Sequence, residues 1–379
     1  MQYLDFDLQI EKEPDVPFYR AQVLNSPAGQ ASTSFSVPFS EQEIENLLLK
    51  IGRPRKGTRG IDSQQMEAAK SFGRRLFEAA FGGDVRSCLR SSLDHAENQD
   101  LGLRIRLRMN GAPELSDLPW EYLFNTVHQR FFSLSALTPI VRYVELPERV
   151  KPFQVELPLR VLVMVSSPPD YPALDVEEEW KKLSDALSEL IEAGIVELTR
   201  LEYASLACLL RTIQKNPYHV FHFVGHGGFN SGIQDGQLIL QDEKGRGVAI
   251  NGSHLGTVLH DHRPLRLVVL NACDGARNGR TDLFSGAAQS LVQQGIPAVI
   301  AMQFEITDKA AIAFAHDFYS AVANGVAIDA SLASARRAIF ALGNDVEWGT
   351  PVLFMRTPDG QLFDIEKFDR SRKSGYSKH

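Results

Sequence analysis

The chain contains little cysteine. Its 379 residues include three cysteines, Cys88, Cys208 and Cys273. Three is an odd number, and it is too few for the disulfide framework that stabilises small secreted proteins. A reducing compartment would also keep a reactive thiol usable. We therefore expect a cytoplasmic protein.

The sequence also lacks a long hydrophobic run. No apolar stretch approaches the roughly 18 residues that a membrane span needs. The first residues, Met1 to Asp5, have neither the basic start nor the apolar core of a secretion signal. We therefore expect no membrane partner.

Basic residues are not in excess. The chain has 40 Lys and Arg against 47 Asp and Glu, which gives a net charge of −7 at pH 7. A protein that coats nucleic acid needs a basic surface to neutralise the phosphates. We therefore expect no direct nucleic-acid binding.

The second half of the sequence alternates between strand and helix patterns. Its apolar runs are short and nearly continuous, which is typical of parallel strands covered on both faces. We therefore predict an α/β fold over residues 159–365, a mostly parallel sheet flanked by helices. The expected strands are residues 159–165, 195–201, 220–224, 266–270, 298–302 and 351–355, with a hairpin at residues 237–240 and 247–250. The expected helices are residues 176–193, 205–216, 251–259, 282–294, 308–323 and 328–342.

Residues 1–150 predict a smaller α/β unit that packs on the second half. After short strand-like pieces, the pattern predicts helices at residues 39–52 and 64–81 and strands at residues 103–107 and 139–144. A linker is expected at residues 147–158, and the polar residues 366–379 predict a disordered tail. Residues 53–60 are basic and contain Pro and Gly, so they predict an exposed loop. This loop is either an ordinary connection or a self-processing site.

A histidine and a cysteine follow two of the predicted parallel strands. His226 lies in a Gly-His-Gly-Gly run after the strand at residues 220–224, and Cys273 lies in an Asn-Ala-Cys-Asp-Gly run after the strand at residues 266–270. Sites in open α/β sheets form at the carboxyl ends of the strands, so both side chains are expected on one rim of one sheet. The histidine precedes the cysteine by roughly the 50 residues found in caspases. A His-Cys dyad is therefore predicted.

These two side chains have the chemistry of a nucleophile and its acid–base partner. A thiolate is a strong nucleophile, and a nearby imidazole supports it and later protonates the leaving amine. Because glycine lets the backbone approach a bound carbonyl, the N–H groups of Gly227 and Cys273 are candidates for an oxyanion hole. The alternative is that Cys273 is a small buried hydrophobe and His226 a satisfied turn residue. The glycine that follows each strand end favours the dyad.

The motifs around both residues resemble those of the CHAT family of caspase-like peptidases, which are relatives of separase. FVGHG at residues 223–227 is similar to the family's histidine motif, and LNAC at residues 270–273 is similar to its cysteine motif. DLPWEYL at residues 117–123 resembles a segment at the start of the same domain. The resemblance implies a caspase-like catalytic domain at residues 159–365, a pseudo-caspase-like unit at residues 1–150, and cleavage of proteins within the chain. One departure is DGA at residues 274–276, where many relatives have Glu-Thr-Gly.

Acidic residues near the same rim are candidates for substrate binding. MQFEITDK at residues 302–309 follows a predicted strand and opens a helix, and it resembles a separase segment of the pattern WDVTDK. The resemblance implies that Glu305 and Asp308 form an acidic pocket for Arg or Lys before the cleaved bond. The alternative for Asp308 is the N-cap of the helix. Asp235 is a further candidate, although a β-turn would use the Asp-Gly pair there in any case.

Two other patterns suggest different sites, and neither is favoured. His254, His260 and His262 fall at a helix end and in a loop without a second set of ligands, which favours a solvated turn over a zinc site. The glycine run at residues 225–228 has neither the G-x-G-x-x-G spacing nor the Gly-Lys-Ser/Thr motif of nucleotide-binding loops. We therefore expect no metal and no organic cofactor.

The sequence thus predicts a cytoplasmic cysteine peptidase, and the resemblance implies that it cleaves within proteins after Arg or Lys. The resemblance to the CHAT family implies a role in bacterial cell death or antiviral defence, and control by an activating protein or complex. One alternative is a catalytically silent module with the same fold that acts as an interaction partner. The intact His-Cys pair argues against it. Another alternative is a thiol hydrolase that acts on small molecules.

Overall fold

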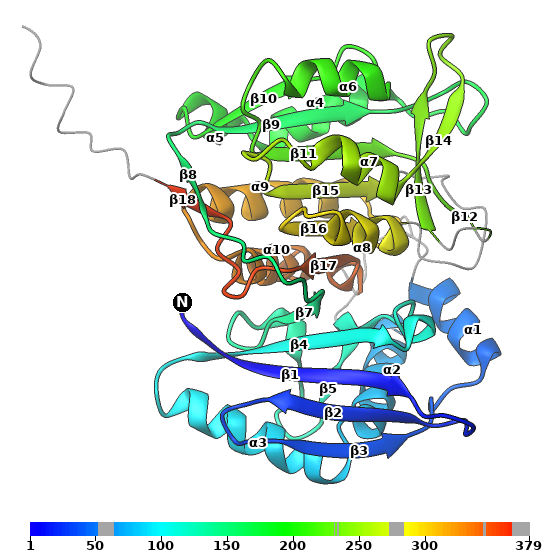
Figure 1. Ribbon diagram of the computed structural model, residues 1–379, viewed down its shortest axis with the longest axis vertical. Coiled ribbons are helices and arrows are strands. Elements are labelled where there is room, and N and C mark those ends of the chain that lie inside the picture. The colour runs from blue at the N-terminus through cyan, green and yellow to red at the C-terminus, as the bar shows by residue number, and fades with distance from the viewer. Residues whose placement is uncertain (52–63, 231, 233–234, 273–283, 344–345, 366–379) are drawn as a thin grey trace, which may run out of the picture.

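One large sheet runs through the molecule. The computed structural model describes residues 1–51, 64–230, 232, 235–272, 284–343 and 346–365. Within these residues, the main sheet has the strand order β10-β9-β11-β15-β16-β17-β7-β4-β1-β2-β3. Figure 1 shows β10 at one end of the molecule and β3 at the other. The predicted loop at residues 53–60 and the predicted tail at residues 366–379 lie outside the described residues.

The first half of the chain supplies five strands of the main sheet and three longer helices. Its helix α3 packs on β1, β3 and β4, while α2 packs beside β3, β5 and the 3₁₀ turn η2. The elements are β1 (Tyr3–Lys12), β2 (Tyr19–Asn25), β3 (Ala31–Phe35), α1 (Glu41–Ile51), α2 (Gln64–Ala80), α3 (Gly83–Glu97), β4 (Gly102–Gly111), η1 (Pro113–Leu115), η2 (Trp120–Tyr122), β5 (Phe124–Asn125), β6 (Arg130–Phe131), η3 (Phe132–Leu134) and β7 (Ile140–Tyr143).

The second half supplies the remaining strands of the main sheet and a small three-stranded sheet of β12, β13 and β14. No helix in the described part of the chain is long and apolar enough to cross a membrane. The elements are β8 (Phe153–Val155), β9 (Leu159–Val165), α4 (Val176–Ala186), α5 (Ser188–Glu192), β10 (Val196–Arg200), α6 (Leu206–Ile213), β11 (Val220–Gly225), β12 (Gly227–Asn230), β13 (Asp235–Gln241), β14 (Gly247–Asn251), α7 (Gly252–Leu259), β15 (Leu267–Ala272), α8 (Ser285–Gln293), β16 (Ala298–Met302), α9 (Asp308–Ala323), α10 (Ile328–Ala341), η4 (Glu347–Gly349), β17 (Pro351–Met355) and β18 (Phe363–Ile365).

Helices cover both faces of the second half because its strands are apolar on both sides. In β11, Phe221 and Phe223 pack in one cluster with α6, α7 and α8. Val220 and Val224 pack in another cluster with α4, α5, α9 and α10. Successive side chains of a strand point to opposite faces, so a strand covered on both faces is mostly apolar on both. The predicted mostly parallel α/β fold is confirmed.

Strand β17 joins the two halves of the sheet. It pairs antiparallel with β16 and parallel with β7, which belongs to the first half. Strands β4 and β1 continue parallel to β7, whereas β9, β10, β11, β15 and β16 run parallel to one another. The carboxyl ends of β11 and β15 therefore lie at the opposite edge of the sheet from those of β1 and β4. The two predicted units share one sheet, and their separation into domains stays a prediction.

Several predicted elements have the bounds that the sequence indicates. Residues 159–165, 298–302, 308–323 and 351–355 form β9, β16, α9 and β17. The single helix predicted at residues 176–193 is wrong. Two helices lie there, because the backbone at Leu187 leaves the helical region with φ −106° and ψ 7°.

Several described elements lie where the sequence predicts none. Helix α3 is one of them, and β12 begins with two glycines, which are poor strand formers. Strand β8 lies within the predicted linker, where it pairs with the distant strand β18. Each of these two strands has three residues, so the pairing itself, not a local pattern, makes them strands.

A buried ion pair ties the two halves together. Arg104 of β4 donates from Nε to Asp329 Oδ2 of α10 over 2.5 Å, and the two side chains are 2% and 0% exposed. The same guanidinium donates to the carbonyls of Pro358 at 3.0 Å and Asp359 at 2.8 Å. Breaking a buried pair leaves an uncompensated charge, which costs more than the pair itself contributes.

We predict that Asp329→Ala lowers the free energy of unfolding by up to about 3–5 kcal/mol. The Arg104 guanidinium stays buried and loses its buried carboxylate, and it keeps only the partly exposed Asp5, whose Oδ1 lies 3.2 Å from Nη1 of Arg104. Urea denaturation followed by circular dichroism measures this change. Glu177→Ala is the control, since Glu177 pairs with Arg200 while its side chain is 78% exposed. It should leave the midpoint unchanged. Equal midpoints for both variants would contradict the assignment.

Candidate active site

His226 lies directly after β11 and is held from one side by a single segment. Its Nε2 is 2.8 Å from the carbonyl oxygen of Pro172. The ring of Tyr171 stacks on the imidazole, with 5.6 Å between ring centroids. His226 is 2% exposed. The imidazole is therefore fixed in orientation at the carboxyl end of a central strand.

The contact with Pro172 also sets the tautomer of the ring. A carbonyl oxygen can only accept, so Nε2 of His226 must carry the proton in this hydrogen bond. In the neutral imidazole, Nδ1 then holds the lone pair. This is the nitrogen that can take a proton from a neighbouring nucleophile.

The segment that holds His226 is itself attached to the hairpin of β13 and β14. The carboxylate of Asp170 accepts from the backbone N–H of Gly247 over 2.7 Å. A Cβ on Gly247 would lie 2.4 Å from the Tyr171 ring, so only glycine allows this approach. Ser166 at the end of β9 donates to the carbonyl of Ile239 over 2.7 Å. No local pattern in the sequence indicates a role for this segment, although its Pro168-Pro169-Asp170-Tyr171-Pro172 run follows a strand at the same rim.

Cys273 lies outside the described residues, but the strand that leads to it is described. Strands β11 and β15 are parallel neighbours, and their register pairs Val224 with Asn271 and Gly225 with Ala272. His226 and Cys273 are the next residues after this last pair in the sequence. Neighbouring strands lie about 4.8 Å apart. The register is the one that the dyad requires, and the dyad itself stays a prediction.

A second histidine on β11 has a structural environment. His222 is buried, and its Nδ1 lies 2.7 Å from the hydroxyl of Tyr319 in α9. Burial lowers the pKa of His222 to about 4. This imidazole is therefore neutral near pH 7 and faces the helix layer. His226, at the end of the strand, is the histidine of the candidate site.

Glycines on either side of His226 serve different purposes. A Cβ on Gly225 would lie 2.7 Å from the Phe223 ring and 3.1 Å from the carbonyl oxygen of Ser166, so packing requires glycine there. A Cβ on Gly228 would meet no atom within 4 Å. Gly227 is half-buried and begins β12, opposite Leu238 of β13. Its predicted place in an oxyanion hole is neither supported nor opposed by these contacts.

The structure places Glu305 and Asp308 after β16, on the rim where β11 and β15 end. Glu305 is half-buried in the connection between β16 and α9. The Asp308 carboxylate is 70% exposed and lies 2.7 Å from Nζ of Lys182 in α4. Thr307, not Asp308, is the N-cap of α9, so the capping alternative for Asp308 is wrong. The two acids share the expected location but differ in exposure.

Asp235 begins β13 and is fully engaged by other elements. Its Oδ2 accepts from the backbone N–H and hydroxyl of Ser253 at 3.1 and 2.7 Å, and its Oδ1 accepts from the Ser290 hydroxyl at 2.6 Å. A Cβ on Gly236 would lie 2.2 Å from the Ala287 nitrogen, so β13 packs on the backbone of α8. Asp235 therefore holds β13 to α7 and α8. These contacts give no support to its predicted role in substrate binding.

The histidines considered for a metal site make ordinary loop contacts. His260 Nδ1 lies 2.7 Å from the carbonyl oxygen of Gln294, and His262 Nε2 accepts from the backbone N–H of Tyr218 over 3.1 Å. Among the described residues, no group of three or more His, Cys, Asp or Glu side chains could hold a metal ion.

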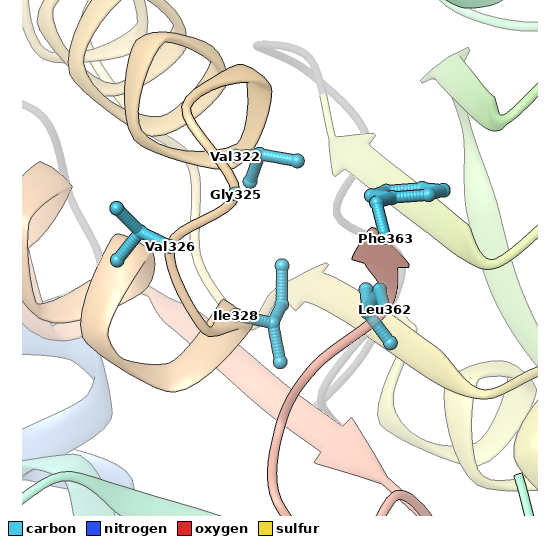
Figure 2. A pocket seen from close by; sticks show the side chains of 6 residues that line it. All are labelled: Val322, Gly325, Val326, Ile328, Leu362 and Phe363. Carbon is cyan, nitrogen blue, oxygen red and sulfur yellow. The ribbon is translucent and has the colours of Figure 1, made fainter. Parts of the chain in front are cut away.

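A small apolar pocket lies away from His226. It is lined by Val322, Gly325, Val326, Ile328, Leu362 and Phe363 (Figure 2). Its residues come from the end of α9, the start of α10 and β18, and Figure 1 shows β18 and β12 on opposite sides of the molecule. The pocket has no polar side chain and takes no part in the candidate site.

Comparison with known proteins gives one family and one fold. The model of the CHAT domain matches residues 70–361, which is most of the chain. No curated protein matches its sequence. The crystal structure of the Saccharomyces cerevisiae separase–securin complex at 2.6 Å resolution has a TM-score of 0.51 and 12% identity, covering 93% of this chain and 30% of that chain. The 3.0 Å structure of the same complex has a TM-score of 0.49 and 12% identity, covering 96% and 30%.

A third structure is less similar in shape. The Arg-specific cysteine proteinase gingipain R has a TM-score of 0.40 and 12% identity, covering 78% of this chain and 68% of that chain. The likeness to the 2.6 Å separase structure supports a shared fold, and the present chain spans less than a third of that protein.

We predict that neutral His226 carries its proton on Nε2, because the Pro172 carbonyl can only accept. Long-range ¹H–¹⁵N correlation of the imidazole nitrogens identifies the tautomer, and loss of the signals in His226→Gln assigns them. His262 is an internal control with the opposite expectation, since its Nε2 accepts from Tyr218 and its proton must lie on Nδ1. A proton on Nδ1 of neutral His226 would contradict the structure.

Proposed function

Because the chain belongs to the CHAT domain family, we propose that it is a cysteine endopeptidase with His226 and Cys273 as its catalytic dyad. One observation carries the proposal: β11 and β15 end in register, with Gly225 paired to Ala272 directly before the two residues. The fixed orientation of His226 against Pro172 supports it further. The described part of the site has the histidine in a form suited to proton transfer.

The proposed reaction follows from the chemistry of the two side chains. Nδ1 of His226 takes the thiol proton of Cys273, and the thiolate sulfur attacks the carbonyl carbon of the substrate. The N–H groups of Gly227 and Cys273 hold the oxyanion of the tetrahedral intermediate. His226 returns its proton to the leaving amine as the C–N bond breaks, which leaves a thioester. Water, deprotonated by His226, then attacks the thioester and releases the second product and the thiol.

We also propose that an acidic pocket selects Arg or Lys before the cleaved bond. Glu305 is the stronger candidate, since it is half-buried and lies between the end of β16 and the start of α9. Asp308 is mostly exposed and already pairs with Lys182, so a substrate cation would have to replace that lysine. Asp235 is a weaker candidate because three donors engage its carboxylate.

The biological setting is proposed on the resemblance alone. We propose a cytoplasmic protease that acts on a protein substrate in bacterial cell death or antiviral defence. Control by an activating protein is part of the proposal. The 2.6 Å separase structure is that of a complex with securin, so a protein of this fold does assemble with a protein partner.

We predict that Cys273→Ala abolishes peptide cleavage and that His226→Ala lowers it by at least about a hundredfold, because the first loses the nucleophile and the second the proton carrier. Cleavage of a proteome, mapped by mass spectrometry for wild type and Cys273→Ala, measures the activity and identifies the cut sites. Cys208→Ser is the matched control, since Cys208 lies in α6 and should be silent.

The same experiment separates the alternatives. A wild type that folds but cleaves nothing, and whose Cys273 resists a cysteine-reactive peptide probe, would indicate the silent interaction module. Turnover of a small amide or ester without protein cleavage would indicate a small-molecule hydrolase. Loss of activity in Cys208→Ser with full activity in Cys273→Ala would refute the dyad.

We predict that peptides with Arg or Lys before the bond are cleaved faster than those with Asp, Leu or Ala. In a shielded pocket, the Glu305 carboxylate would form a hydrogen-bonded ion pair with the arginine side chain of the substrate. Glu305→Gln loses that pair and should lower kcat/KM for the Arg peptide by about 10- to 100-fold. Asp308→Asn should have a smaller effect because solvent screens that carboxylate. Steady-state kinetics with matched fluorogenic peptides tests this order. Preferred cleavage after Asp by the wild type would rule out the acidic pocket.

A further inference from the structure

The connection that carries Glu305 is anchored on both sides of that residue. On one side, Gln303 donates from its backbone N–H to the Thr350 carbonyl at 3.0 Å and from Nε2 to the Gly349 carbonyl at 2.8 Å. On the other side, Thr307 donates to Oε2 of Glu347 from its N–H at 3.0 Å and from its hydroxyl at 2.7 Å. Glu305 thus lies two residues from each anchor.

The Glu347 carboxylate is suited to fixing this connection. It is 4% exposed, and one of its oxygens receives both donors of Thr307. Hydrogen bonds to an ionised acceptor are roughly twice as strong as those between neutral groups. A buried carboxylate also needs such donors, because it has given up its hydration. Glu347 and Thr307 therefore depend on each other.

The turn η4, which contains Glu347, packs against the first half of the chain. The Tyr122 hydroxyl donates to the Val346 carbonyl over 2.7 Å. A Cβ on Gly349 would lie 2.4 Å from the Tyr122 ring, so this ring and the η4 backbone are in direct contact. Trp348 packs edge-on against Tyr122 with ring centroids 5.1 Å apart. Turn η4 is therefore clamped by the segment Trp120–Tyr122.

A second link from the same segment reaches Gln303. Glu121 is 1% exposed and pairs with Arg142, whose Nη2 donates to Glu121 Oε2 over 2.9 Å. The same oxygen accepts from Gln303 Nε2 over 3.2 Å. The connection with Glu305 is thus held by Glu347 at one end and by Gln303, through Glu121, at the other.

We propose that Glu347 is a positioning residue for substrate recognition: its bonds to Thr307 hold Glu305 where the basic side chain of the substrate binds. The inference rests on the proposed function. It also assigns the segment Trp120–Tyr122 a role in specificity, since that segment supports Glu347 and Gln303. Glu347 acts through Thr307 and does not touch the reacting atoms.

The proposal makes a specific kinetic prediction. An interaction that binds the substrate side chain equally in the ground and transition states changes KM and leaves kcat unchanged. Glu347→Ala should therefore raise KM for a peptide with Arg before the bond by about tenfold, with kcat within about twofold of wild type. Glu347→Gln keeps an acceptor oxygen and should recover most of the loss. Thr307→Ser keeps both donors and should match wild type, whereas Thr307→Val keeps only the backbone N–H donor and should raise KM less than Glu347→Ala does.

A control separates positioning from general loss of stability. Asp329 is also a buried carboxylate of the second half, but its contacts are with Arg104 and the start of α10. Asp329→Asn should lower the melting temperature and leave KM unchanged at a temperature where every variant is folded. Hydrogen–deuterium exchange of the peptide that covers residues 303–309 gives a readout that needs no activity. Exchange there should rise in Glu347→Ala and stay at the wild-type level in Asp329→Asn.

The outcomes distinguish this proposal from the proposed function. An unchanged KM in Glu347→Ala, or a loss confined to kcat, overturns the positioning role. A KM that rises equally in Asp329→Asn also overturns it, because the effect would then be one of stability. If the wild type cleaves no peptide, the proposed function fails. Hydrogen–deuterium exchange at residues 303–309 then tests by itself whether Glu347 anchors this connection. Unchanged exchange at residues 303–309 in Glu347→Ala then overturns the anchor as well.

Discussion

The structure depends on the parallel register between β11 and β15. Strand β11, which is buried throughout, and β15, which is buried from Leu267 to Leu270, end together, with Gly225 opposite Ala272. This pairing decides which residues follow side by side. The register is maintained by helices on both faces, since each strand buries alternate side chains into two separate clusters. A slip by one residue would exchange the faces of every side chain in the strand. Packing over the whole strand therefore fixes the geometry at its end.

Burial divides the acidic residues of this rim into two groups. Asp235, Glu121 and Glu347 are 6%, 1% and 4% exposed, and each accepts hydrogen bonds from a different element of the fold. A carboxylate removed from water is retained only where donors replace its hydration, so these three connect elements. Asp308 keeps its contact with water. The buried acids thus differ from the exposed one in the hydrogen-bond donors that surround them. Those donors come from distant parts of the chain, so the linear sequence does not show the difference.

The sequence predicts most of the second half because its signals are local. Residues 298–302 form an unbroken apolar run and residues 308–323 an apolar helical pattern, and both appear with the expected bounds. What it misses depends on distant partners. Strands β8 and β18 exist through pairing with each other. Tyr171 lies against His226 in a segment that Asp170 attaches to Gly247 of the β13–β14 hairpin. The donors to Asp235 come from Ser253 and Ser290, so no pattern near residue 235 indicates its structural role.

The junction at β17 has a mechanical consequence. Strand β17 pairs with β7 at Phe354–Arg142 and Met355–Tyr143, whereas its pairing with β16 runs from Pro351 to Met355. The seam between β17 and β7 therefore has fewer paired residues than the pairing of β17 with β16, and by backbone hydrogen bonds alone it is a weak point of the continuous sheet. Side-chain contacts across this seam hold the two halves together where backbone hydrogen bonds are few. They are the ion pair of Arg104 with Asp329 and the hydrogen bond of Tyr122 to the η4 turn. A force that pulled the two halves apart would therefore strain the support of Glu305 before it disturbed the strands that end beside His226.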